Sequence, residues 1–122
     1  MASRFLQRAE KEIYRKLSAI LMEVKDPRLS GRLTLSRVVL SADLSQLKIY
    51  VFINEEEERQ KDMLDALNNA IPFLRRRLGE SVRLKRTPAL KVFHDKTPER
   101  AANIESIISN LHETGELADS DS

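Results

Sequence analysis

A proline inside a helical apolar pattern is the feature that most limits how this chain can fold. Between Glu55 and Gly79, apolar residues recur at the three- and four-residue spacing of one helix side: Met63, Leu64, Leu67, Ala70, Ile71, Leu74 and Leu78. Pro72 lies within that stripe. Proline lacks an amide donor and disfavours helical geometry at the residue before it, here Ile71. The pattern therefore predicts two helices that meet in a bend at Ala70-Ile71-Pro72.

An amphipathic helix is predicted ahead of this pair, from Ser3 to Val24. Its apolar side would hold Leu6, Ala9, Ile13, Leu17, Ile20 and Val24. Asp26-Pro27 ends it. Two strands are predicted next, over Leu33–Leu40 and Leu47–Ile53, because apolar residues alternate there. The alternation slips by one near Ser36-Arg37, and a β-bulge at that point would return the apolar residues to one face.

A third strand is predicted over Leu90–His94. A last helix should start at Thr97-Pro98-Glu99, with an apolar side made of Ala101, Ile104, Ile107, Ile108 and Leu111. These elements predict an α+β fold in the order α-β-β-α-α-β with a kinked helix pair and a C-terminal helix. That order is the topology of a KH-like domain of the second type. We expect this domain over residues 1–112 and a disordered acidic tail over residues 113–122.

Composition argues against several classes of enzyme and metalloprotein. The chain has 122 residues and no cysteine, so thiol nucleophiles and disulfides are excluded, and His94 and His112 lack a metal-ligand spacing. The carboxylates of Glu55 to Glu58 would point in different directions around a helix turn, which indicates a solvated helix start. We expect no catalysis, cofactor or metal. Without a membrane-length apolar stretch or a signal peptide, we expect a cytoplasmic protein with no membrane partner.

Charge is strongly segregated along the chain. The net charge of +2 combines +5 over residues 1–50, −4 over 51–72, +6 over 73–91 and −5 over 92–122. Such segregation is typical of a protein with one basic face that meets a polyanion.

Two groups of basic residues are the candidate RNA-binding site. The first follows the bend and comprises Arg75, Arg76, Arg77, Arg83, Lys85 and Arg86. Glu80 is the one acid in that window, so the cations should repel one another unless RNA phosphates neutralise them. A merely solvated helix end is the alternative. The second group is a stripe on the outer side of the first predicted helix, where phosphate contact and simple solubility explain the pattern equally well: Arg4, Arg8, Lys11 and Arg15.

Several motifs, taken together and in order, resemble the ribosome-binding factor A family. They are Asp26-Pro27-Arg28-Leu29, the strand segment Thr34–Ser41 with Asp43-Leu44, Leu74-Arg75 with Leu78, and the tract from Lys85 through Pro88 and Leu90 to Asp95. The tract departs from the family pattern in having Lys85 for arginine and Val92 for phenylalanine. At the bend, Ala70-Ile71-Pro72 stands where the family usually has Ala-x-Gly.

The resemblance implies a non-catalytic, cold-shock-associated factor that binds the free small (30S) ribosomal subunit and 16S rRNA, and that promotes late maturation and rRNA processing. It also implies that the bend and the basic residues after it form the RNA surface. Assembly GTPases are further candidate partners, and a monomer is the default state. The alternative is a protein-protein adaptor without direct RNA contact, working through the last predicted helix and the acidic residues Glu58, Asp62 and Asp65.

Overall fold

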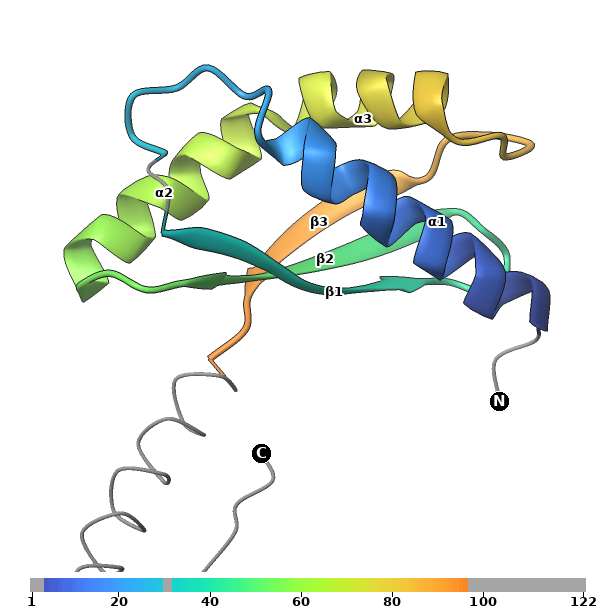
Figure 1. Cartoon of the computed structure of the whole chain (residues 1–122), viewed down its shortest axis with the longest axis horizontal. Coiled ribbons are helices and arrows are strands. Elements are labelled where there is room, and N and C mark those ends of the chain that lie inside the picture. The colour runs from blue at the N-terminus through green and yellow to red at the C-terminus, as the bar shows by residue number, and fades with distance from the viewer. Residues whose placement is uncertain (1–3, 30–31, 97–122) are drawn as a thin grey trace, which may run out of the picture.

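Three helices cover one face of a three-stranded sheet in the computed structural model, which describes residues 4–29 and 32–96 (Figure 1). The elements are α1 (Arg4–Leu21), β1 (Leu33–Leu40), β2 (Gln46–Ile53), α2 (Glu57–Asn69), α3 (Ile71–Ser81) and β3 (Ala89–His94). The predicted α+β class and the order α-β-β-α-α-β are confirmed. The predicted last helix, the acidic tail and the boundary between residues 112 and 113 lie outside the described residues.

The sheet has the order β1-β2-β3, with β1 and β2 antiparallel and β2 and β3 parallel. Its register shifts between Leu35, which pairs with Val51, and Arg37, which pairs with Tyr50. Ser36 is therefore the extra residue of a β-bulge, as the slip in the apolar alternation predicted. The bulge keeps Leu35 on the buried side and returns Val38 and Leu40 to it.

The core lies between this sheet and the helices. Its fully buried side chains include Ile13 and Leu17 of α1, Leu47 and Ile49 of β2, Met63 and Leu67 of α2, and Leu74 and Leu78 of α3. Burial of each contributes about 1.5–3 kcal/mol relative to exposure. The apolar stripes that the sequence predicted are thus the surfaces that hold the layers together.

The bend between α2 and α3 falls at Ala70, which has φ −89° and ψ −2°. The Ala70 N–H donates to the carbonyl of Ala66 at 3.0 Å, which completes the last turn of α2. The Ala70 carbonyl accepts from the Leu74 N–H at 2.9 Å, which is the first helical hydrogen bond of α3. Pro72 lies in the first turn of α3, where its missing amide leaves no intrahelical bond unmade. Ile71 is already helical, so the irregular residue is one position earlier than the proline rule predicted.

The β1–β2 turn is organised by one carboxylate. Asp43 accepts hydrogen bonds from the hydroxyls of Ser41 (2.8 Å) and Ser45 (2.7 Å) and from the Ser45 N–H (3.0 Å). These donors lower the pKa of Asp43 to about 2. The next residue, Leu44, has φ +63°, a left-handed conformation that leucine rarely adopts. The hydrogen bonds to Asp43 fix the turn in which that conformation occurs.

The connector between α3 and β3, residues 82–88, folds back against the end of α3. Gly79 makes this approach possible, because a Cβ at that position would lie 2.7 Å from Oγ1 of Thr87. Arg75, one helix turn before Gly79, also holds the connector against α3. It donates from Nε to the Pro88 carbonyl at 3.0 Å and from Nη2 to the Thr87 carbonyl at 2.8 Å.

Candidate nucleic-acid interface

The exposed side of α1 carries the basic stripe that the sequence predicted. Ala9, Ile13 and Leu17 are buried against the sheet, so the side chains on the far side are exposed: Arg4, Arg8, Lys11 and Arg15. Arg15 forms an ion pair with Glu12 at 2.6 Å. Within the described part of the chain, the other three cations form no ion pair with a carboxylate, so they are available to an anionic ligand.

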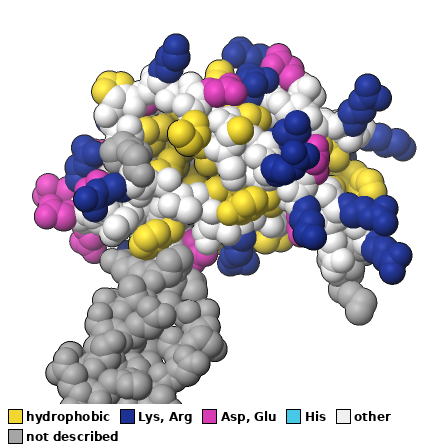
Figure 2. Space-filling model, viewed as in Figure 1, with side chains coloured by type: hydrophobic (Ala, Val, Ile, Leu, Met, Phe, Trp, Pro, Cys, Tyr) yellow, Lys and Arg dark blue, Asp and Glu magenta, His cyan; other side chains and the backbone are white. Residues whose placement is uncertain are grey.

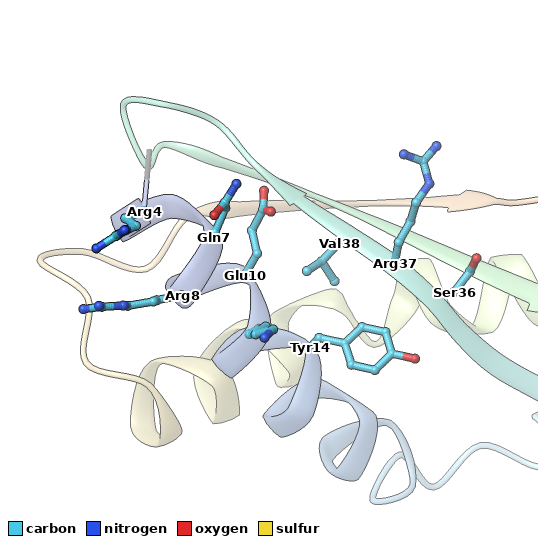
Figure 3. A pocket seen from close by; sticks show the side chains of 9 residues that line it. Arg4, Gln7, Arg8, Glu10, Tyr14, Ser36, Arg37 and Val38 are labelled. Carbon is cyan, nitrogen blue, oxygen red and sulfur yellow. The ribbon is translucent and has the colours of Figure 1, made fainter. Parts of the chain in front are cut away.

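A groove of about 570 Å³ runs between α1 and β1 (Figure 3). We call it the α1–β1 groove, and its lining residues are Arg4, Gln7, Arg8, Glu10, Lys11, Tyr14, Ser36, Arg37 and Val38. Four of the nine are cations. A surface concavity with this excess of positive charge is suited to a phosphate backbone.

Two hydrogen bonds fix the walls of the α1–β1 groove. The Tyr14 hydroxyl donates to the Leu35 carbonyl at 2.9 Å, and the Glu10 carboxylate accepts from the Leu40 N–H at 2.8 Å. Glu10 therefore holds the end of β1 and is partly neutralised by a backbone donor, which weakens its repulsion of an anion in the groove.

The basic tract after the bend divides into residues that bond to other parts of the protein and residues that form no ion pair or hydrogen bond with its described residues. Arg75 is committed to the connector carbonyls. Arg77 joins α3 to the end of α1, donating from Nε and Nη2 to Glu23 at 2.8 and 3.0 Å, and it also pairs with Glu80 at 3.0 Å. The hydrogen bond from Arg77 lowers the pKa of Glu23, and the two carboxylates raise the pKa of Arg77. The expectation that these cations stay uncompensated without RNA is therefore wrong for Arg77, whereas Arg75 has only neutral carbonyl partners.

The other cations of the tract remain exposed: Arg76, Arg83, Lys85 and Arg86. Arg76 lies over the ring of Phe73, 5.5 Å from its centroid. Figure 2 shows Lys and Arg side chains gathered at the end of the molecule where α1 begins and where α3 leads into the connector. At the opposite end, over α2, acidic side chains lie beside basic ones (Figure 2).

The described residues contain no group of three or more His, Asp or Glu side chains that could hold a metal ion. In the Glu55–Glu58 run, Glu57 and Glu58 lie in the first turn of α2, and Glu55 pairs with Arg32 at 3.6 Å. His94 is half-buried, and its Nε2 accepts from the Ile53 N–H at 3.3 Å. None of the described helices is long and apolar enough to cross a membrane.

Sequence reasoning did not identify Arg37, Glu10 and Tyr14 as parts of the α1–β1 groove. Arg37 could have been found from the slip in strand periodicity, because a bulge turns the residue after it to a new direction. Glu10 and Tyr14 lie off the basic stripe, and only the packing of α1 on β1 brings them to the groove.

These features define the chain as a small α+β protein with a cation-lined groove. The model of the ribosome-binding factor A family matches residues 6–108, and the chain belongs to that family. It is 36% identical to ribosome-binding factor A of a Synechocystis species over 98% of this chain and 94% of the relative. The family is described as a ribosome-binding factor and not as a class of enzyme.

Solved structures agree with this assignment. The crystal structure of ribosome-binding factor A from Thermus thermophilus is similar with a TM-score of 0.67 and 34% identity, over 75% of this chain and 97% of that one. A homology model of the Thermus thermophilus protein, fitted into a cryo-EM map of a 30S complex, is similar with a TM-score of 0.60 and 36% identity, over 71% and 91%.

Proposed function

We propose that this chain is a cytoplasmic, non-catalytic assembly factor that binds the free 30S subunit through 16S rRNA. In this proposal it promotes late 30S maturation and rRNA processing, including adaptation to cold. It acts as a monomer through a KH-like domain, with assembly GTPases as further candidate partners. The similar Thermus thermophilus protein, whose model was fitted into a map of a 30S complex, supports the small subunit as the partner.

The observation that carries the proposal is the α1–β1 groove with its exposed Arg4, Arg8 and Lys11. These cations lie on one helix, so the fold sets the spacing of their Cα atoms before any ligand arrives. Exposed cations without a carboxylate partner bind a folded RNA by its phosphates and shape. The connector, which carries the exposed Arg83, Lys85 and Arg86, lies at the end of the molecule where α1 begins (Figure 1).

The bend contributes to this surface because it sets the direction of α3, which carries the arginines of the basic tract. A hollow of about 420 Å³ lies beside it, lined by Glu23, Val24, Lys25, Asp26, Ala66, Asn69, Ala70 and Phe73. Both acids of the hollow already form ion pairs, Glu23 with Arg77 and Asp26 with Arg28. The hollow offers fewer cations than the α1–β1 groove, so we assign the main phosphate contacts to the groove and the connector.

Co-sedimentation of the full chain with purified 30S and 50S subunits tests the proposal. We expect binding to 30S subunits and not to 50S subunits, with a steep loss as salt rises. Replacing Arg4, Arg8 and Lys11 together by Ala should weaken binding. It should also lower the salt slope by up to about 0.9 for each phosphate that the variant no longer neutralises, the value for duplex DNA.

A control variant with the same loss of charge separates local contacts from net charge. Arg59, Lys61 and Lys96 are exposed and lie outside the α1–β1 groove, the hollow beside the bend and the connector, and their triple Ala variant should keep the parent's salt slope. Equal losses in the two variants would overturn the assigned surface, and equal binding to both subunits would overturn the function.

The adaptor alternative makes the opposite prediction. Its acidic surface on α2, formed by Glu58, Asp62 and Asp65, is exposed. If α2 made the contact, a variant with these three residues changed to Asn or Gln would lose 30S binding while the groove variant would not.

A further inference from the structure

The face of the sheet turned away from the helices carries a row of stacked side chains across all three strands. The register places Arg37 of β1 opposite Tyr50 of β2, and Phe93 of β3 beside Tyr50. The rings of Tyr50 and Phe93 stack with their centroids 5.3 Å apart, and the Arg37 guanidinium lies 4.0 Å from the Tyr50 ring centroid. Phe93 is nevertheless 39% exposed. The row therefore combines an available aromatic surface with a cation.

The bulge at Ser36 builds this row. In a regular strand, alternation from Leu35 would put Ser36 on this face and turn Arg37 to the other one. Figure 3 shows Arg37 pointing away from α1 while Val38, the next residue, points back toward the helix layer. Arg37 thus stands at the edge between the α1–β1 groove and the opposite face of the sheet.

A second row adds two cations. Lys48 and Lys91 are paired in the register of β2 and β3, both are exposed, and Val39 of β1 is opposite Lys48. The two rows are two residues apart along the strands, or about 7 Å. The three strands contain no Asp or Glu. Asp95, just after β3, is 9% exposed, accepts a hydrogen bond from Ser36 at 2.7 Å and lies 3.8 Å from the Arg37 guanidinium, which balances its charge.

This combination suits one kind of ligand. An apolar protein surface would have to desolvate Lys48 and Lys91 without neutralising them. A nucleic-acid duplex would present phosphates to the cations, but its bases are already stacked on one another. A single strand has both groups available, because an unpaired base can stack on an aromatic ring while the neighbouring phosphates meet the cations.

We propose that this sheet face is a second nucleic-acid site, which takes an unpaired single-stranded RNA segment. One base stacks on Phe93 beside Tyr50, and Arg37, Lys48 and Lys91 hold the adjacent phosphates. The site is separate from the α1–β1 groove, and its existence does not depend on the proposed function of that groove.

The two tyrosines of the chain allow a direct test. Tyr50 lies in the proposed site, whereas Tyr14 lines the α1–β1 groove. The full chain labelled with 3-fluorotyrosine should give one ¹⁹F resonance for each, assigned through a Tyr14→Phe variant. Titration with a ten-nucleotide single-stranded oligouridylate should shift the Tyr50 resonance. The same sequence annealed to its complement should shift it much less.

A matched pair of aromatic variants measures the stacking. Phe93→Leu keeps an apolar side chain in the row but removes the ring, and it should weaken oligouridylate binding about fivefold or more in fluorescence anisotropy. Phe5, on α1, is 58% exposed and lies outside both rows, so Phe5→Leu should bind like the parent. Equal melting temperatures would establish that Phe93→Leu is folded, and the ¹⁹F shift of the parent stands as a test even if it is not.

Two results would overturn the proposal. One is a titration in which the oligouridylate shifts Tyr14 and leaves Tyr50 unmoved, because the strand would then occupy only the α1–β1 groove. The other is a folded Phe93→Leu variant with the parent's affinity, because no base would then depend on the ring.

Discussion

The hydroxyl of Ser36 donates to the carboxylate of Asp95 at 2.7 Å, joining the bulge of β1 to the residue that follows β3. The two residues are 59 positions apart and lie on opposite sides of the central strand, β2. Asp95 is buried, and Arg37 approaches the same carboxylate at 3.8 Å. One carboxylate therefore holds both the extra residue of the bulge and the arginine that the bulge redirects.

Removing that hydroxyl should destabilise the fold. In Ser36→Ala, a buried carboxylate loses a donor, and we expect the free energy of unfolding to fall by about 1–3 kcal/mol. Urea denaturation would measure the change. Ser18→Ala is a suitable control, because Ser18 is half-buried on α1 and forms no side-chain hydrogen bond with another described residue. Comparable losses in the two variants would contradict the role of the Ser36–Asp95 bond.

A methyl group at Gly79 should clash with the side chain of Thr87, and shortening Thr87 should relieve the clash. Alanine normally stabilises a helix by about 1 kcal/mol relative to glycine, but here its Cβ would lie 2.7 Å from Oγ1 of Thr87. We expect Gly79→Ala to lower the melting temperature and Gly79→Ala with Thr87→Ala to recover it. A double-mutant cycle without positive coupling would mean that the connector moves away at no cost.

Arg76 and Arg77 should have opposite phenotypes although they are neighbours. Arg77 is held by Glu23 and Glu80, so Arg77→Ala should lower the melting temperature. Arg76 is exposed, so Arg76→Ala should leave the melting temperature unchanged and reduce the salt slope of 30S binding. Calorimetry and co-sedimentation on both variants would show whether the two effects separate. A reversed pattern would contradict the division of the tract into structural and exposed cations.

The turn at Asp43 should lose part of its contribution to stability in acid. The folded-state pKa of Asp43 is about 2, below the value of about 3.9 for an unfolded chain. A lowered pKa stabilises the fold above pH 4, and that stabilisation is lost as the pH falls through 2. Asp43→Asn should therefore be less stable than the parent at pH 6, and the difference should close toward pH 2.

Pro72 should fix the bend before any ligand is bound. Pro72→Ala restores an amide that could bond the Asn68 carbonyl, so helical content should rise by circular dichroism while 30S binding weakens, because the α3 cations turn away. Pro72→Gly should give an intermediate loss. Parent-like binding by Pro72→Ala would mean that the RNA surface does not depend on the bend.

The elements of this fold could be predicted because their signals are local. Three- and four-residue spacing defined the helices, alternation defined the strands, and the slip near Ser36 defined the bulge. The position of the bend was predicted to within a residue. Proline disfavours helical geometry at the residue before it, which is Ile71. Here Leu67 and Leu74 pack into one core, Ile71 stays helical, and the irregular geometry falls at Ala70.

The candidate site was less predictable because it depends on tertiary contacts. Periodicity showed that Arg4, Arg8 and Lys11 would be exposed, but it could not show a groove, which requires α1 to lie along β1. Nor could it separate Arg75 and Arg77 from Arg76. The acceptors for Arg75 belong to the connector, and the main acceptor for Arg77 is Glu23 at the end of α1, so each pairing exists only after the chain has folded back on itself.

The parallel pairing of β2 with β3 has a consequence for the order in which the chain folds. The β1–β2 hairpin closes across a short turn, whereas β3 is separated from β2 by the whole of α2 and α3, and closing that long loop costs entropy before any strand bond forms. Native contacts of β3 should therefore be weak in the folding transition state. In the native protein the same strand should be the edge that opens first. Amide exchange would then be fastest in β3 among the three strands, and each opening would release Asp95 from Ser36.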